Sequence, residues 1–95
     1  MVYVLIPAYE PDERLVALVA ALRSADLQVL VVDDGSGPAY APTFDEARAL
    51  GATVLGYPVN RGKGHALKVG FAWLAEVRPG SDVVCADCDG QHTLA

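Results

Sequence analysis

The chain has 95 residues, 53% of them hydrophobic, and a formal net charge of −5 at pH 7. This length suits one small domain, and the acidic balance, without a cluster of lysine and arginine, argues against a nucleic-acid partner, which would require a basic face. No apolar run approaches the roughly 18 residues of a membrane span, no signal peptide is visible, and two cysteines are too few for a disulfide scaffold, so we expect a cytoplasmic protein.

The first half of the chain alternates between apolar runs and one helical pattern. Residues 2–6 are β-branched and aromatic and predict a strand, which Pro7 should end because proline has no N–H to donate to a neighbouring strand. Leucine and valine spaced at i, i+3, i+4 and i+7 predict an amphipathic helix over 11–24, with Pro11 at its first position. A nearly continuous apolar run over 27–32 predicts a second, buried parallel strand.

The second half continues the alternation after a turn-rich loop at 33–38. Its predicted elements are a helix over 43–50, a strand over 52–55, a helix over about 64–77 and a fully buried strand over 83–86. Thr43 and Glu46 have the spacing of a capping box at the start of the first of these helices. The order β-α-β-α-β-α-β predicts an α/β fold, a three-layer α/β/α arrangement around an open parallel sheet.

Two aspartates separated by one residue follow the last predicted strand. If the chain stays extended there, Asp87 and Asp89 project to the same side, because side chains alternate with period two. Two such carboxylates repel one another unless a cation lies between them, and Mg²⁺ and Mn²⁺ favour oxygen ligands of this kind. The alternative is an acidic turn that only closes a strand, since aspartate and glycine are common in turns.

Polar loops follow three of the four predicted strands. They are Pro7–Glu10, Asp33–Ser36 and Asp87–Asp89. Ligands of open parallel sheets bind beyond the carboxyl ends of the strands, near the point where the strand order switches. Because all three loops should lie at that edge, a shared ligand explains them better than three unrelated acidic turns.

The segment Asn60–Gly64 lies at the start of a predicted helix and contains two glycines and two basic residues, Arg61 and Lys63. Glycines let the backbone approach a ligand, and a helix N-terminus attracts phosphate. The segment has neither P-loop spacing nor a dinucleotide fingerprint, and the alternative is a glycine-rich turn with solvated basic side chains. Cys85 and Cys88 form a C-x-x-C pair, but Cys85 lies inside a strand, so we expect packed free cysteines.

Taken together, four segments resemble family 2 glycosyltransferases of the GT-A fold, in their nucleotide-sugar-binding half. The segments are Ile6–Glu10, Val31–Ser36, Asn60–Gly64 and Ala86–His92. They occur in the order and spacing of the family and span nearly the whole chain. The last segment is similar to the D-x-D-G-Q-H form found in dolichyl- or polyprenyl-phosphate sugar transferases.

The resemblance implies transfer of a sugar from a UDP- or GDP-sugar to an acceptor such as a polyprenyl phosphate, with inversion. It implies a Mg²⁺ or Mn²⁺ ion on the donor diphosphate, held by Asp87, Asp89 and Gln91. Asp34 would contact the nucleotide base or ribose. The full set of implied substrate-binding residues is Pro7, Ala8, Tyr9, Glu10, Asp34, Arg61, Lys63 and Asp87.

The chain departs from the family pattern in two ways. Cys88 stands where related transferases often have alanine, which should be harmless because the middle residue of D-x-D is not a ligand. Family members also continue well past this point, so we expect residues 1–95 to be a single, truncated partial domain that lacks the acceptor half and the catalytic base. We expect it to be inactive alone, and the full-length protein to lie at the cytoplasmic face of a membrane.

Two other functions fit parts of the pattern. Sugar-phosphate nucleotidyltransferases have a similar fold, but they carry a glycine-rich basic loop directly after the first strand, where this chain has Pro7–Tyr9. The other is a non-catalytic Rossmann-like domain for nucleotide binding or protein interaction, in which the acidic turns only terminate strands.

Overall fold

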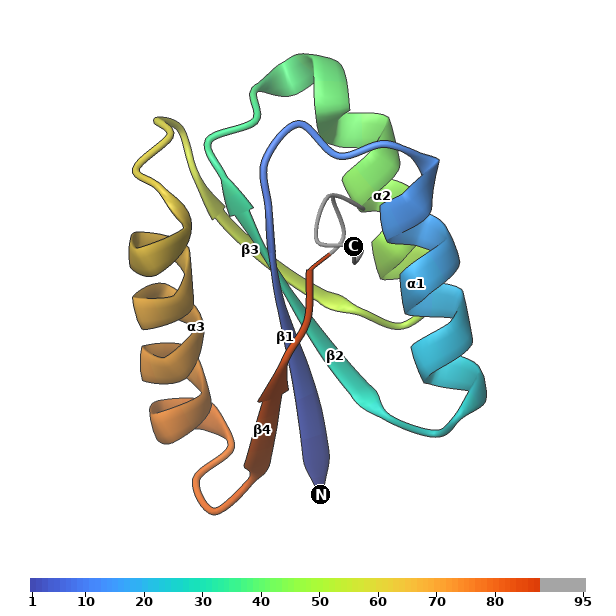
Figure 1. The fold of residues 1–95 in the computed structure, drawn as a ribbon, viewed down its shortest axis with the longest axis vertical. Helices are drawn as coiled ribbons and strands as arrows, with labels where there is room; N and C mark the ends of the chain where they lie inside the picture. The colour runs from blue at the N-terminus through green and yellow to red at the C-terminus, as the bar shows by residue number, and fades with distance from the viewer. Residues whose placement is uncertain (88–95) are drawn as a thin grey trace, which may run out of the picture.

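The computed structural model describes residues 1–87 and has the α/β fold that the sequence predicts (Figure 1). Its elements are β1 (Val2–Ala8), α1 (Glu13–Ser24), β2 (Gln28–Asp34), the short 3₁₀ helix η1 (Pro38–Tyr40), α2 (Ala41–Ala49), β3 (Thr53–Tyr57), α3 (Lys63–Val77) and β4 (Asp82–Cys85). The four strands form one parallel sheet in the order β3-β2-β1-β4. Helices α1 and α2 cover one face of the sheet, and α3 covers the other.

The core is divided by the sheet into two clusters, because successive side chains of β1 and β2 point to opposite faces. On the α1 and α2 face, Ile6 and Val31 pack with Leu15 and Phe44. On the α3 face, Leu5 and Leu30 pack with buried side chains of α3. The central strands β1 and β2 are therefore covered on both sides, which fixes their carboxyl ends in place at the edge where the polar loops emerge.

Strand β1 continues through Pro7, so the prediction that proline ends this strand is wrong. The register pairs Pro7 with Val32 of β2. Residues of a parallel strand bond alternately to the two neighbouring strands, and the Leu5 carbonyl accepts from Ala86 on the β4 side at 3.0 Å. Pro7 comes two residues after Leu5, so its backbone also faces the β4 side, where β4 has already ended. Its missing N–H therefore removes no hydrogen bond to β2, and β1 continues to pair with β2 past Pro7.

Helix α1 begins two residues later than predicted, because Asp12 is its N-terminal cap and Glu13, not Pro11, is its first residue. The Asp12 carboxylate accepts the Arg14 backbone N–H at 2.9 Å and forms an ion pair with the Arg14 guanidinium at 2.8 Å. Hydrogen bonds from the Arg14 side chain hold the pKa of this carboxyl below its usual value. Pro11 precedes the cap and is buried.

Helix α2 begins at Ala41, so the predicted capping box at Thr43 is wrong. Its N-cap is Tyr40, and no side chain makes a capping hydrogen bond there. Pro42 lies in the first turn, where a missing N–H costs nothing, so the helix starts before Thr43 and continues directly from η1. Gly51 follows the helix with φ +106°, a conformation that favours glycine.

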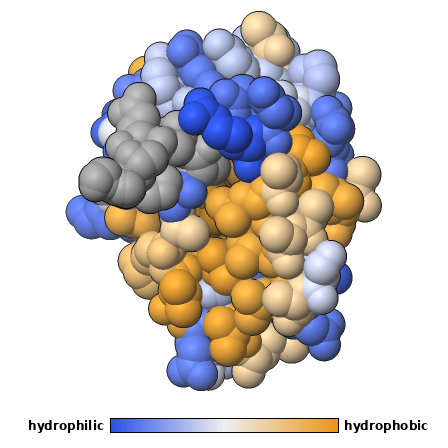
Figure 2. Space-filling model, turned by 45° about the vertical axis from the view of Figure 1, so that its right-hand side comes forward, coloured by the Kyte–Doolittle hydropathy of each residue, from blue (hydrophilic) through white to orange (hydrophobic). Residues whose placement is uncertain are grey.

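Strand β4 lies at the edge of the sheet and is not fully buried, contrary to the prediction. Val84 pairs with Val4 and therefore shares the face that α1 and α2 cover elsewhere, yet Val84 is 55% exposed. Cys85 is free and exposed, so the expectation of a packed cysteine is also wrong at that position. Figure 2, in which the side carrying α1 is turned forward, shows apolar side chains gathered over a broad area.

Candidate functional site

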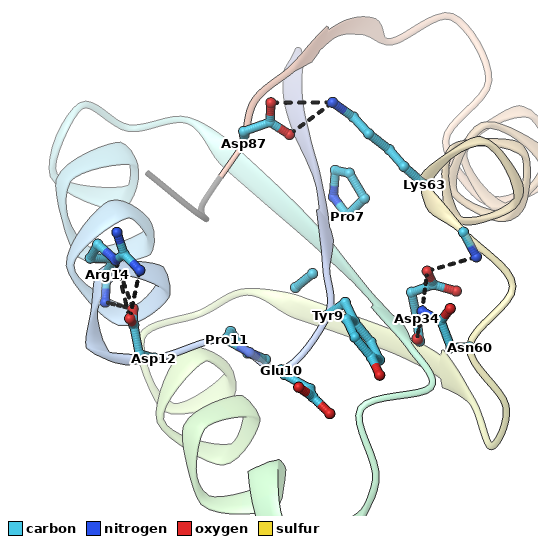
Figure 3. A pocket seen from close by; sticks show the side chains of 12 residues that line it. Pro7, Tyr9, Glu10, Pro11, Asp12, Arg14, Asp34, Asn60, Lys63 and Asp87 are labelled. Carbon is cyan, nitrogen blue, oxygen red and sulfur yellow. Dashed lines mark hydrogen bonds and ion pairs between the residues drawn. The ribbon is translucent and has the colours of Figure 1, made fainter. Parts of the chain in front are cut away.

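A cavity of about 470 Å³ opens at the carboxyl ends of β1, β2 and β4, beside the start of α3 (Figure 3). In the strand order β3-β2-β1-β4, the chain leaves β1 toward β2 through α1 on one face and reaches β4 through α3 on the other. Ligands of open parallel sheets bind at this kind of switch point. The cavity therefore lies where the topology predicts a ligand.

The cavity brings together most of the residues that the sequence singled out. These are Pro7, Ala8, Tyr9, Glu10, Asp34, Lys63 and Asp87. Arg61 is exposed and does not line the cavity, and its backbone N–H donates to Asp34, which does. Asp89 and Gln91 lie outside the described residues, so their metal-binding role stays a prediction.

Sequence reasoning missed several residues that line the cavity. Asn60 and Gly62 belong to the recognised glycine-rich segment, so their position after β3 could have suggested a site role. Asp12 and Arg14 at the start of α1 also line it. The sequence offered no signal for this pair beyond its place directly after the loop that follows β1.

The loops after β1 and β2 are tied together by a short chain of hydrogen bonds. The Glu10 N–H donates to Ser36 Oγ at 2.8 Å, and the Ser36 N–H donates to Asp33 Oδ1 at 2.9 Å. Glu10 has φ +48°, so this bend is held in a conformation that is uncommon for glutamate. Tyr9 is 52% exposed at the cavity, and the negative charge of Glu10 is the main cause that raises the pKa of its hydroxyl.

Asp34 lies at the base of the cavity and is only 3% exposed. Its two carboxylate oxygens accept four hydrogen bonds, from the Tyr57 hydroxyl (2.7 Å), the Asn60 side-chain amide (2.9 Å) and the backbone N–H groups of Arg61 and Gly62 (2.9 Å each). The Asn60 amide also donates to the Asp34 backbone carbonyl at 3.0 Å. The end of β2 is thereby bonded to the loop that precedes α3.

Tyr57, the last residue of β3, remains a hydrogen-bond donor to this network. Burial is the largest cause that raises the pKa of its hydroxyl, followed by its hydrogen bond to Asp34. The Tyr57 ring also makes an edge-to-face contact with the ring of His65 on α3, with 5.1 Å between centroids. Tyr57 thus links β3 to both the Asp34 carboxylate and the first turn of α3.

Lys63 and Asp87 form an ion pair across the rim of the cavity (Figure 3). The Lys63 ammonium lies 3.0 Å from one Asp87 oxygen and 3.2 Å from the other. Both side chains are partly accessible, 60% for Lys63 and 30% for Asp87, so each can exchange its partner for a ligand. The first residue of α3 and the segment after β4 therefore place one positive and one negative group at the same opening.

Asp87 is the one predicted metal ligand whose position the structure describes. Its carboxylate is a hard oxygen donor at the cavity rim, which suits Mg²⁺ or Mn²⁺. Within residues 1–87, no group of three or more histidine, cysteine, aspartate or glutamate side chains could hold a metal ion. Asp87 is thus the described member of the predicted ligand set, and the other two members, Asp89 and Gln91, follow it in the sequence.

The comparisons with known proteins identify one family. The model of glycosyl transferase family 2 matches residues 3–94, nearly the whole chain. No curated protein and no solved structure matches. In the part of the chain that the structure describes, no helix has both the length and the apolar character needed to cross a membrane. The extent of the family match, together with the α/β fold and the cavity at its switch point, shows that this chain belongs to the family 2 glycosyltransferases.

Proposed function

We propose that the cavity binds a UDP- or GDP-sugar and that the chain contributes the donor site of a sugar transferase. Family membership supports glycosyltransferase activity with a nucleotide-sugar donor. The observation that carries the proposal is the meeting of the segment after β1, Lys63 and Asp87 at one opening, although they are far apart in the sequence. A nucleoside diphosphate needs a pocket for its base and positive charge for its phosphates, and a carboxylate serves it when a divalent ion lies between the two.

Each end of the cavity suits a different part of the donor. The half-exposed Tyr9 ring offers a flat apolar surface on which a nucleobase can stack. Lys63 offers an ammonium group to the diphosphate at the first position of α3, where the helix dipole also favours negative charge. The diphosphate is therefore assigned to the Lys63 and Asp87 rim, and the base to the segment after β1.

A divalent ion, Mg²⁺ or Mn²⁺, completes this proposal. Asp87, with Asp89 and Gln91, would hold the ion, and a bound ion would neutralise charge on the departing nucleoside diphosphate. Asp87 would then exchange Lys63 for the ion, which frees the Lys63 ammonium to approach the diphosphate. In this arrangement Lys63 and Asp87, which form an ion pair with each other, both act on the donor.

For the acceptor we propose a polyprenyl phosphate, on the strength of the D-x-D-G-Q-H segment that begins at Asp87. An acceptor oxygen would form its bond to the anomeric carbon on the side opposite the departing nucleoside diphosphate. The bond to the diphosphate breaks as the new bond forms, so the configuration of the sugar is inverted. Acceptor and inversion both rest on the resemblance of this segment to the polyprenyl-phosphate subgroup.

Calorimetric titration with UDP and GDP, each with and without Mn²⁺, tests the donor site. We expect metal to tighten binding, and Asp87→Asn to abolish that increase. Asp45→Asn is the matched control, because Asp45 is an exposed aspartate that pairs with Arg48 on α2 and does not line the cavity. Nucleotide binding that is indifferent to both metal and Asp87→Asn would instead favour a non-catalytic binding or interaction domain.

A further inference from the structure

Glu10 places a carboxylate at one end of the cavity. It is exposed and lines the cavity beside Tyr9, whose half-exposed ring is the proposed stacking surface for the base. The charge of Glu10 is the main cause that raises the pKa of the Tyr9 hydroxyl, and a side-chain hydrogen bond between the two residues is the second cause. The two side chains therefore lie together, on the side of the cavity away from Lys63 and Asp87 (Figure 3).

The backbone of Glu10 is held in place at this end of the cavity. Its N–H donates to Ser36 Oγ at 2.8 Å, and Ser36 is buried. The next residue, Pro11, is buried as well. With φ +48°, Glu10 has a backbone conformation that is uncommon for residues other than glycine, and such conformations cluster at ligand-binding sites. The carboxylate is thus attached to a fixed point of the cavity wall, with only its side-chain torsions left to adjust.

Nucleobases differ in the number of donors that they offer to a carboxylate. An ionised carboxylate has two oxygens and only accepts hydrogen bonds. Guanine offers two adjacent donors, N1–H and its 2-amino group, and can bond to both oxygens at once. Uracil offers one donor, N3–H, between two carbonyl oxygens that repel a carboxylate. Hypoxanthine, the base of IDP, has the ring system of guanine and its N1–H but lacks the amino group.

We propose that Glu10 determines the base specificity of the donor site and selects guanine over uracil. A guanine that stacks on the Tyr9 ring turns its N1–H and 2-amino group to the Glu10 carboxylate at the same end of the cavity. A site built to receive two donors discriminates against a base that offers one. This inference rests on the proposed function and deepens it, because it names a GDP-sugar as the donor.

Calorimetric titration with GDP, IDP and UDP, each in Mg²⁺, measures this selection. GDP and IDP differ only in the 2-amino group, so the ratio of their affinities isolates one hydrogen bond to the carboxylate. A hydrogen bond to a charged group corresponds to roughly 10- to 100-fold in an equilibrium constant, and we expect about tenfold because Glu10 is exposed. UDP should bind no more tightly than IDP. Equal wild-type affinities for GDP and IDP would overturn the inference.

Glu10→Gln changes the pattern of acceptors and donors at the base. A glutamine amide offers one acceptor and one donor, which suits N1–H and O6 of guanine and hypoxanthine as well as N3–H and O4 of uracil. We expect the ratios of GDP to IDP affinity and of GDP to UDP affinity each to fall by about tenfold. Glu13→Gln is the matched control, because Glu13 is an exposed glutamate at the start of α1 that does not line the cavity, and it should leave both ratios unchanged.

The same titrations separate base recognition from other roles of Glu10. If the carboxylate bonds to the ribose hydroxyls, which all three nucleotides share, Glu10→Gln will weaken all three by one factor and leave the ratios intact, which overturns the inference. Inorganic pyrophosphate has no base and should bind Glu10→Gln as tightly as the wild type. A wild-type chain that binds GDP, IDP and UDP equally refutes this inference alone, whereas one that binds no nucleotide refutes the proposed function as well.

Discussion

Replacing Gly35 with alanine is expected to destabilise the protein more than the same change at Gly37. Both glycines have positive φ values, +69° and +91°, and a backbone strained in this way costs about 1–3 kcal/mol. At Gly35 the new Cβ would also overlap backbone atoms of Val59 and Asn60, which no side-chain rotation can relieve, whereas at Gly37 nothing lies within 4 Å. Overpacking typically adds about 1–3 kcal/mol, so we expect a difference of that size between the two variants.

Urea unfolding, followed by the fluorescence of Trp73, measures this difference, since the chain has one tryptophan. With a slope of about 1 kcal/mol per molar urea, the Gly35→Ala midpoint should fall roughly 1–3 M below that of Gly37→Ala. Gly80→Ala is a second control, because Gly80 has φ +85° and also faces open space. Equal midpoints for the three variants would refute the argument that β2 and the loop before α3 are in close backbone contact.

Three further changes test other parts of the structure. Lys63→Met should leave the free energy of unfolding within about 1 kcal/mol, because an exposed ion pair contributes little, yet weaken UDP binding roughly tenfold in calorimetry; unchanged affinity would remove Lys63 from the site. The pKa of Asp12 is held below its ordinary 3.8, so its charge stabilises the fold above that pH and the stabilisation is lost as the pH falls through the folded-state pKa. Asp12→Ala should therefore lower the urea midpoint at pH 7. The difference in midpoint between wild type and variant should shrink as the pH falls through the folded-state pKa of Asp12, and a constant difference would contradict this reasoning. Val31→Ala should cost about 2–3 kcal/mol and Val84→Ala less than about 1 kcal/mol, since the first side chain is fully buried and the second 55% exposed, and equal thermal shifts would count against an exposed β4 edge.

The fold followed from the sequence because its strongest signals are local. Continuous apolar runs predicted β1 and β2, and the helical spacing after Pro11 predicted α1. The exposure of β4 could not be predicted in this way. Val84 is as apolar as Val31, and only the strand order, which is set by contacts far apart in the chain, places β4 at the edge.

Local sequence motifs gave a wrong prediction where the same residues were compatible with two different first residues of a helix. Thr43 and Glu46 have capping-box spacing, but Pro42 is equally suited to the first turn of a helix that begins earlier. The actual start of α2 is set by its direct continuation from η1, and no sequence motif indicates that continuation. At Pro7, the outcome depended on where the neighbouring β4 ends, again a property of another part of the chain.

Much of the cavity could be predicted, since topology places the ends of parallel strands at one edge and Glu10, Asp34 and Asp87 all follow or end strands. The network around Asp34 could not. Two of its four donors are the backbone N–H groups of Arg61 and Gly62, and almost any residue type supplies such a group. The sequence therefore drew attention to the arginine side chain, whereas the hydrogen bond to Asp34 comes from its backbone N–H.

The position of Tyr57 at the end of an outer strand has a consequence for behaviour on warming. β3 has a neighbour on one side only, and marginal strands of this kind open locally at lower free energy than the strands between them. Each such opening breaks the hydrogen bond from the Tyr57 hydroxyl to Asp34. The loop before Lys63, which also bonds to Asp34, is then less firmly held. Nucleotide affinity should thus decline at temperatures where the centre of the sheet is still intact, so that the site melts before the fold does.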